Sequence, residues 1–168
     1  CIRDRREWLD EQNDDLPEPE SLASVWNDLP ELAPPLIDGV LRQGHKMLIA
    51  GPSKAGKSFA LIGMCVSIAE GLPWFGWECA QGRVLYVNLE LDRASCLHRF
   101  RDVYEAMGAV PNNLANIDIW NLRGKSKPMD ELAPSLIRRA LKTRPIAVII
   151  DPIYKVITVS YTHLRAHE

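Results

Sequence analysis

The hydrophobic positions of this chain fall into two kinds of segment, which alternate along much of its length. Four short, mainly apolar runs have the composition of buried β-strands, and they cover residues 46–50, 84–89, 117–122 and 146–150. Three longer segments have the length and apolar spacing of helices, and they cover residues 59–70, 92–107 and 130–143. Strands separated by helices predict right-handed βαβ crossovers. The expected fold class is therefore α/β, with a mostly parallel sheet and flanking helices.

Charge divides the chain into two parts. Residues 1–34 carry three basic and ten acidic side chains, a net charge of −7, and contain several prolines. This composition is typical of an acidic linker or a disordered tail. Residues 35–168 carry seventeen basic and twelve acidic side chains, a net charge of +5. A mildly basic core permits an anionic ligand but does not by itself demonstrate nucleic-acid binding.

Cysteine usage and hydropathy bound the cellular setting. The four cysteines show no C-x-x-C spacing, and the four histidines form no convincing metal-ligand set. Free buried thiols suit a reducing cytosol. No apolar run reaches the length of a membrane span, and no signal peptide is visible. We therefore expect a cytoplasmic protein without membrane contact.

Residues 51–58 match the P-loop pattern G-x-x-x-x-G-K-[ST] at every fixed position, and an apolar run precedes them while a helical segment follows. Glycines at the two fixed positions allow successive backbone N–H groups to surround phosphate oxygens at a helix N-terminus. Lys57 is expected to reach the β- and γ-phosphates of ATP, and the Ser58 hydroxyl is expected to bind Mg²⁺. The Lys54 side chain is expected to be solvated. The predicted nucleotide-binding residues are Gly51, Pro52, Ser53, Lys54, Ala55, Gly56, Lys57 and Ser58.

Two carboxylates follow predicted strands, and the carboxyl ends of strands are where α/β folds carry functional groups. Asp151 ends the run 146–150 in the form of a Walker B strand, so it is expected to hold Mg²⁺ directly or through water. Glu90 follows the run 84–89, where a carboxylate beside ATP can orient or deprotonate the attacking water. Glu90 and Lys57 are thus the predicted catalytic residues. The alternative for Glu90 is a carboxylate that stabilises the start of the next helix near Asp92.

Taken in order, residues 51–58, 84–90 and 147–151 resemble the RecA-like P-loop ATPases. The phrases LYVNLE and IIDPIYK make residues 36–158 similar to the RepA-type hexameric replicative helicases of plasmids, phages and mobile elements, a group of AAA-type ATPases. The resemblance implies an ATP-hydrolysing DNA helicase or translocase that uses ATP and Mg²⁺, binds single-stranded DNA and forms a homo-hexamer. It implies the roles given above for Lys57, Ser58, Glu90 and Asp151.

The resemblance also implies a later sensor residue and an arginine finger, and neither has a counterpart before the chain ends. Residues 159–168 back-translate to a string that resembles a transposon-end sequencing adapter, so we expect them to be a non-native scar. The expected organisation is an acidic segment at 1–34, a truncated and incomplete RecA-like ATPase domain at 35–158 and the scar. A fragment of this kind need not be active alone.

Two other functions remain open on the residues alone. A P-loop kinase acting on a small molecule would use the same phosphate loop but needs a pocket for its second substrate. A nucleotide-dependent interaction switch would bind ATP without acting as a motor. Both share the P-loop with an ATPase, so the loop sequence cannot separate them.

Overall fold

The structure is a computed structural model that describes residues 17–125 and 127–157. The chain divides into one unit of Cys1–Leu32 and a second of Ala33–Glu168. In the first unit the described residues form a short helix, α2 (Leu22–Val25), with the neighbouring Trp26 exposed. The predicted scar at 159–168 lies outside the described residues, as does the first half of the predicted acidic segment.

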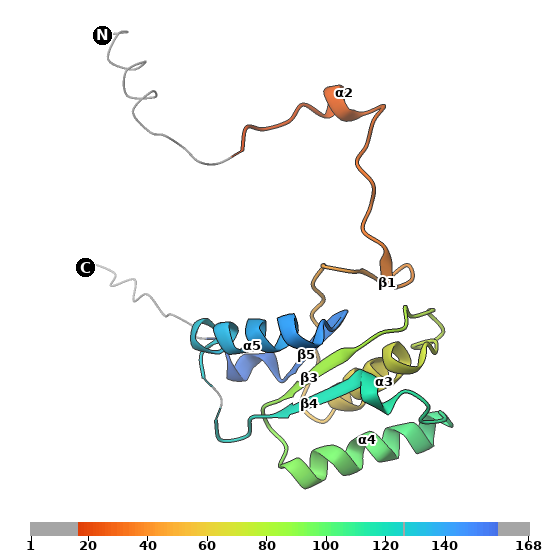
Figure 1. The fold of residues 1–168 in the computed structure, drawn as a ribbon, viewed down its shortest axis with the longest axis vertical. Helices are drawn as coiled ribbons and strands as arrows, with labels where there is room; N and C mark the ends of the chain where they lie inside the picture. Colours follow the sequence, from red (N-terminus) through yellow and green to blue (C-terminus); the bar gives the residue numbers. More distant parts are fainter. Residues whose placement is uncertain (1–16, 126, 158–168) are drawn as a thin grey trace, which may run out of the picture. The chain divides into compact units, whose positions relative to one another are not determined.

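Three parallel strands form the centre of the second unit (Figure 1). They are β3 (Val84–Asn88), β4 (Ile117–Asn121) and β5 (Ala147–Asp151), in the spatial order β4-β3-β5. The apolar composition of β3 follows from its central place, because every one of its residues is buried. The predicted α/β class with a parallel sheet and flanking helices is confirmed.

Helices cover both faces of this sheet. Figure 1 shows α3 (Lys57–Glu70) and α4 (Arg93–Met107) on one side and α5 (Met129–Thr143) on the other. Two hydrophobic clusters match this layering, because side chains alternate between the two faces along each strand. Tyr86 and Ile149 pack with α3 and α4, whereas Leu85 and Val87 pack with α5. The alternation therefore decides which strand residues face the helix that follows the P-loop.

The helices begin and end at residues with a physical reason to be there. Asp92 caps α4 by accepting a 2.9 Å hydrogen bond from the Ser95 N–H. Gly71 and Gly108 end α3 and α4 in the left-handed conformation that glycine tolerates best. The first helical turn of α5 carries Asp130 and Glu131, whose negative charges interact favourably with the positive end of the helix dipole.

The predicted strand at 46–50 is absent, and this part of the prediction is wrong. Residues 45–50 adopt no regular structure, and Leu48 is 73% exposed. A strand is stable when its backbone groups pair with a neighbouring strand. Residues 46–50 form no such pairing, because among the residues that the structure describes the sheet consists of β4, β3 and β5 only and β5 pairs with β3. Upstream, β1 (Pro35–Ile37) and β2 (Leu41–Arg42) form a small antiparallel hairpin instead. The sheet therefore contains three strands rather than the four predicted from the apolar runs.

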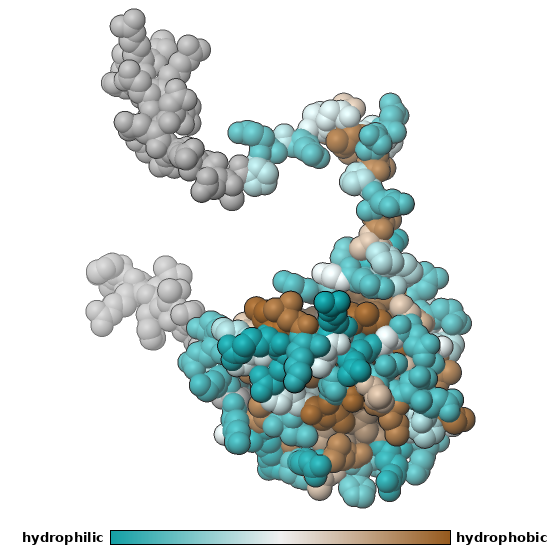
Figure 2. All heavy atoms as spheres, viewed as in Figure 1, coloured by the Kyte–Doolittle hydropathy of each residue, from teal (hydrophilic) through white to brown (hydrophobic). Residues whose placement is uncertain are grey.

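Figure 2 shows exposed hydrophobic residues between hydrophilic ones on the visible face of the second unit. The apolar residues of α5 are only partly buried: Leu132 is covered, whereas Ile137 and Leu141 are exposed. A short 3₁₀ turn, η1 (Leu114–Asn116), precedes β4, and another, η2 (Ile153–Lys155), follows β5. In the described ranges, none of the helices combines the length and the hydropathy needed to cross a bilayer.

Candidate functional site

The P-loop forms an irregular turn that leads directly into α3. Lys54 and Gly56 have positive φ angles of 63° and 79°, and the Ala55 N–H donates a 3.3 Å hydrogen bond to the Pro52 carbonyl. Residues of alternating hand turn successive N–H groups toward one side, which creates a concavity for an anion. The first N–H groups of α3, from Lys57 onward, have no acceptor within their own helix. The loop backbone is therefore suited to phosphate oxygens.

The Lys57 side chain folds back over this loop. Its Nζ donates hydrogen bonds of 2.9 Å to the Gly51 carbonyl and 2.6 Å to the Pro52 carbonyl. Both acceptors belong to the turn itself, so the ammonium lies over the loop rather than in free solvent. Neutral carbonyls bind an ammonium less strongly than charged phosphate oxygens do. A phosphate group in the loop can therefore take the lysine over from these carbonyls.

Asp151 is the last residue of β5, and its side chain points to the face that α3 covers. In the sheet register it lies beside Asn88, and Asn88 lies beside Asn121 of β4. Cys65 of α3 and Tyr86 belong to one buried cluster on this face, and the Tyr86 hydroxyl donates to Asp151. The predicted Walker B acid and the helix that starts at the P-loop therefore share one face of the sheet.

A hydrogen bond from Tyr86 occupies one oxygen of this carboxylate. The Tyr86 hydroxyl donates to Asp151 Oδ2 over 2.6 Å, and both side chains are buried. Burial and the neighbouring carboxylate raise the pKa of Tyr86, so its hydroxyl remains a proton donor. A phenol at this distance fixes the plane of the carboxylate, and the other oxygen, Oδ1, remains as an acceptor for a further partner.

Ser58 and Asp151 supply the kind of oxygen donors that Mg²⁺ prefers. Mg²⁺ usually takes one or two protein oxygens, substrate phosphates and water, rather than a cage of protein ligands. Accordingly, the described residues hold no cluster of three or more histidine, cysteine or acidic side chains that would bind a metal alone. The residues present fit a magnesium ion brought in with a nucleotide.

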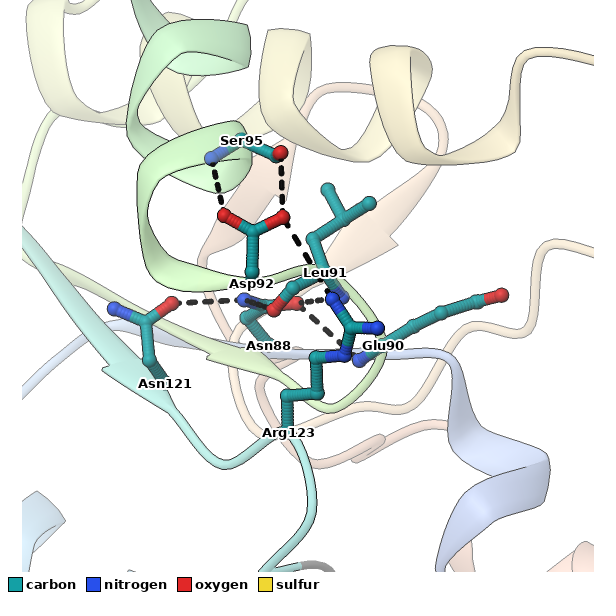
Figure 3. A network of polar contacts seen from close by, with 7 residues as sticks. All are labelled: Asn88, Glu90, Leu91, Asp92, Ser95, Asn121 and Arg123. Carbon is teal, nitrogen blue, oxygen red and sulfur yellow. Dashed lines mark hydrogen bonds and ion pairs between the residues drawn. The ribbon is translucent and has the colours of Figure 1, made fainter.

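Glu90 lies in the turn between β3 and α4, two residues past the end of the strand. Its side chain is exposed and points away from Asn88, Asn121 and Asp92 in Figure 3. Among the described residues the Glu90 carboxylate has no hydrogen-bond or ion-pair partner. The structure therefore leaves this carboxylate free to meet a ligand.

Asn88 ties the backbone of this turn to the sheet (Figure 3). Its Oδ1 accepts hydrogen bonds from the Glu90 N–H at 3.3 Å and the Leu91 N–H at 2.9 Å. Its Nδ2 donates to the Leu91 carbonyl and to Asn121 Oδ1, both at 2.8 Å. The Asn88 amide thus uses both ends to hold the segment that carries Glu90.

A second connection joins the basic loop after β4 to the start of α4. Arg123 lies 3.7 Å from Asp92 Oδ2, and both side chains are about half exposed or more (Figure 3). Hydrogen bonds from Ser95 lower the pKa of Asp92, and the Arg123 charge lowers it further. Exposed ion pairs contribute little to stability. The Arg123–Asp92 pair therefore contributes little to the stability of the fold.

Sequence reasoning singled out Glu90 and Asp151 but missed the residues that hydrogen-bond to the Asp151 carboxylate and to the Glu90 backbone. Tyr86 and Asn88 lie within a run that was assigned as a buried strand and nothing more. One signal was available for Asn88 and Asn121: each is a polar residue at the carboxyl end of a predicted strand. No signal in the sequence pairs Tyr86 with Asp151, because the contact depends on the order of the strands.

Comparison with known proteins gives one match. A family model described as an AAA domain matches residues 13–162. Neither the curated proteins nor the solved structures contain a significant match to this chain.

Proposed function

This chain belongs to the AAA domain family of ATPases, and on that premise we propose that it is the ATP-hydrolysing core of a RecA-like DNA helicase or translocase. Membership of the family makes the chain a nucleotide-dependent ATPase and accounts for a P-loop in an α/β fold. The helicase role, in the replication of a plasmid, phage or other mobile element, goes further and comes from the resemblance of residues 36–158 to RepA-type helicases.

One observation carries the hydrolytic part of the proposal. The helix that begins at Lys57 covers the face of the sheet on which Asp151 lies, which supports a joint role for the phosphate loop and this acid. In P-loop NTPases this combination holds the phosphates and their Mg²⁺.

Each residue has a distinct task in the proposed reaction. The backbone of residues 51–58 cradles the phosphates, and Lys57 neutralises charge on the transferred phosphoryl group. Ser58 and Asp151 hold Mg²⁺, which, when bound, supplies further neutralisation of the phosphates. Glu90 orients or deprotonates the attacking water from its exposed position in the turn after β3.

Binding of single-stranded DNA and assembly into a homo-hexamer complete the proposal. The net charge of +5 on residues 35–168 is compatible with an anionic polymer. Three of the basic residues in this count, Arg123, Lys125 and Lys127, are exposed in the loop after β4. These features support DNA binding but have no sequence specificity, as expected for a protein that contacts the phosphate backbone.

The test measures ATP turnover by the protein with and without single-stranded DNA. We expect DNA to increase turnover, and we expect Lys57→Ala to abolish both nucleotide binding and turnover. Lys54→Gln is the matched control, because it removes a lysine of the same loop whose side chain makes no hydrogen bond to the P-loop.

The outcomes separate the functions that the P-loop shares. If the protein hydrolyses ATP but neither binds DNA nor is stimulated by it, the helicase proposal is contradicted and the ATPase activity remains. Nucleotide binding without turnover, with or without DNA, favours an interaction switch. Phosphate transfer from ATP to a small molecule rather than to water favours a kinase.

A further inference from the structure

Asn88 occupies an unusual position for a polar side chain. It ends the central strand β3, it is 2% exposed, and it lies two residues before Glu90. A buried amide is stable only when its donors and acceptors are paired. Each of its two ends has at least one partner, and most of these partners belong to the turn that follows.

The direction of the Glu90 side chain depends on the backbone of this turn. Its carboxylate has no partner among the described residues, so no side-chain contact fixes it. The Asn88 amide binds the Glu90 N–H, the Leu91 N–H and the Leu91 carbonyl, which restricts the backbone on both sides of the Glu90 Cα. Removing these bonds frees the turn to move, although the Glu90 carboxylate itself is retained in the chain.

We propose that Asn88 is a positioning residue for Glu90, and that Asn121 orients Asn88 from the neighbouring strand. The proposal rests on the proposed function, since it assigns Asn88 a role through the hydrolytic carboxylate. Catalytic groups must be held in productive geometry, and a displacement of about 1 Å can cost on the order of 100-fold in rate. Asn88 supplies that precision to a residue in an otherwise exposed turn.

Asn121 reinforces the orientation of the Asn88 amide that the Glu90 and Leu91 backbone groups require. Its Oδ1 accepts a hydrogen bond from Asn88 Nδ2, so a reversed Asn88 amide would bring two oxygens together. The pair lies at one level of the sheet, because Asn88 and Asn121 are register partners in β3 and β4. The backbone joins them as well, since the Leu122 N–H donates to the Asn88 carbonyl over 2.8 Å.

A double-mutant cycle distinguishes positioning from general support of the fold. In Asn88→Ala we expect kcat to fall about 10- to 100-fold, while KM for ATP changes by less than about threefold. In a Glu90→Gln background the same substitution should cause no further loss, because the group that it positions is already inactive. Equal losses in both backgrounds, or no loss in the single variant, would overturn the proposal.

Asn121 offers a matched pair of variants at a partly exposed site. Asn121→Asp keeps an oxygen that accepts from Asn88, whereas Asn121→Leu removes it. We expect turnover close to wild type in Asn121→Asp and a clear loss in Asn121→Leu. Equal behaviour of the two variants contradicts the orienting role, and the pair keeps the proposal testable if Asn88→Ala does not fold.

Hydrogen exchange tests the same hold without any turnover. In Asn88→Ala the Glu90 and Leu91 amides should exchange about five- to tenfold faster, because each loses a hydrogen bond that contributes roughly that factor. Asn121→Leu keeps these two hydrogen bonds but releases the Asn88 amide, so it should raise both rates by a smaller factor. Asn121→Asp should leave both rates unchanged, and so should amides within β3 in all variants. Unchanged Glu90 and Leu91 rates would overturn the proposal. If Asn88→Ala exchanges faster but the wild-type protein shows no ATP turnover, the proposed function has failed. Asn88 then supports only the turn.

Discussion

The hydroxyl of Tyr86 donates a hydrogen bond of 2.6 Å to Oδ2 of Asp151, across two neighbouring strands of the sheet. Tyr86 faces Ile149 in the register of β3 and β5, so Asp151 is its diagonal neighbour on the same face. The tyrosine ring is itself held edge-on against Phe100 of α4, with a centroid distance of 5.2 Å. A packed aromatic side chain therefore sets the orientation of the acid that we assign to Mg²⁺.

Substitution of Tyr86 by phenylalanine should weaken the magnesium site. Partners that orient metal-binding carboxylates typically contribute about 10- to 100-fold to metal affinity. We expect Tyr86→Phe to raise, within that range, the Mg²⁺ concentration that supports nucleotide binding, as measured by titration at fixed ATP.

Tyr104→Phe is the matched control for this experiment. The Tyr104 hydroxyl also donates to a carboxylate, Glu70, but that pair lies at the end of α3 away from the P-loop. We expect its Mg²⁺ dependence to equal that of the wild type. An identical shift in both variants would show that loss of stability, rather than loss of orientation, is responsible.

Glu90→Gln should separate nucleotide binding from hydrolysis. The amide keeps the size of the side chain but cannot accept a proton, and general-base catalysis contributes roughly 10²- to 10⁴-fold. We expect ATP affinity to remain at the wild-type level and turnover to fall by a factor in that range. Normal hydrolysis by Glu90→Gln would remove Glu90 from the catalytic set. Glu105→Gln, an equivalent change at an exposed carboxylate of α4, should be silent in the same assay.

Ser58→Ala should lower nucleotide affinity only when magnesium is present. The hydroxyl is one of two proposed protein ligands, while the loop backbone that surrounds the phosphates is unaffected by its loss. We expect nucleotide affinity in the presence of EDTA to match the wild type and the gain in affinity on adding Mg²⁺ to be lost. Ser53→Ala, in the same loop, is the control, and a variant at Ser58 with a normal magnesium response would contradict the assignment.

Acidification should destabilise the protein in part through Glu70. Burial raises the pKa of this carboxyl, but hydrogen bonds from Asn113 and Tyr104 outweigh it and bring the pKa below its ordinary value of 4.5. A lowered pKa in the folded state gives stability that is present above pH 4.5 and is lost as the pH falls through the folded value. We expect the melting temperature of Glu70→Gln to lie below that of the wild type at neutral pH. The difference should shrink at pH values well below 4.5, and a constant difference across the whole range would contradict this linkage.

The sequence predicted most elements because local signals were strong. The helix predicted over 92–107 begins after its cap Asp92, and the helix predicted over 59–70 ends at Glu70, before Gly71. The strand predicted over 46–50 failed, because an apolar run forms a strand only if a partner pairs with its backbone. For α5, helical spacing predicted a buried face, but the spacing cannot say how much of that face a three-stranded sheet can cover, and Leu141 is 72% exposed.

By itself the sequence determined the phosphate loop at 51–58, the alternation of strands and helices, and the acids that follow two strands. These are properties of neighbouring residues, and spacing is enough to detect them. Only the tertiary structure decided that β3 lies between β4 and β5, which brings Asn121, Asn88 and Asp151 to one level of the sheet. The contacts of Tyr86 with Asp151, and of Asn88 with Asn121, follow from that order, because residues far apart in the chain meet only when their strands are neighbours.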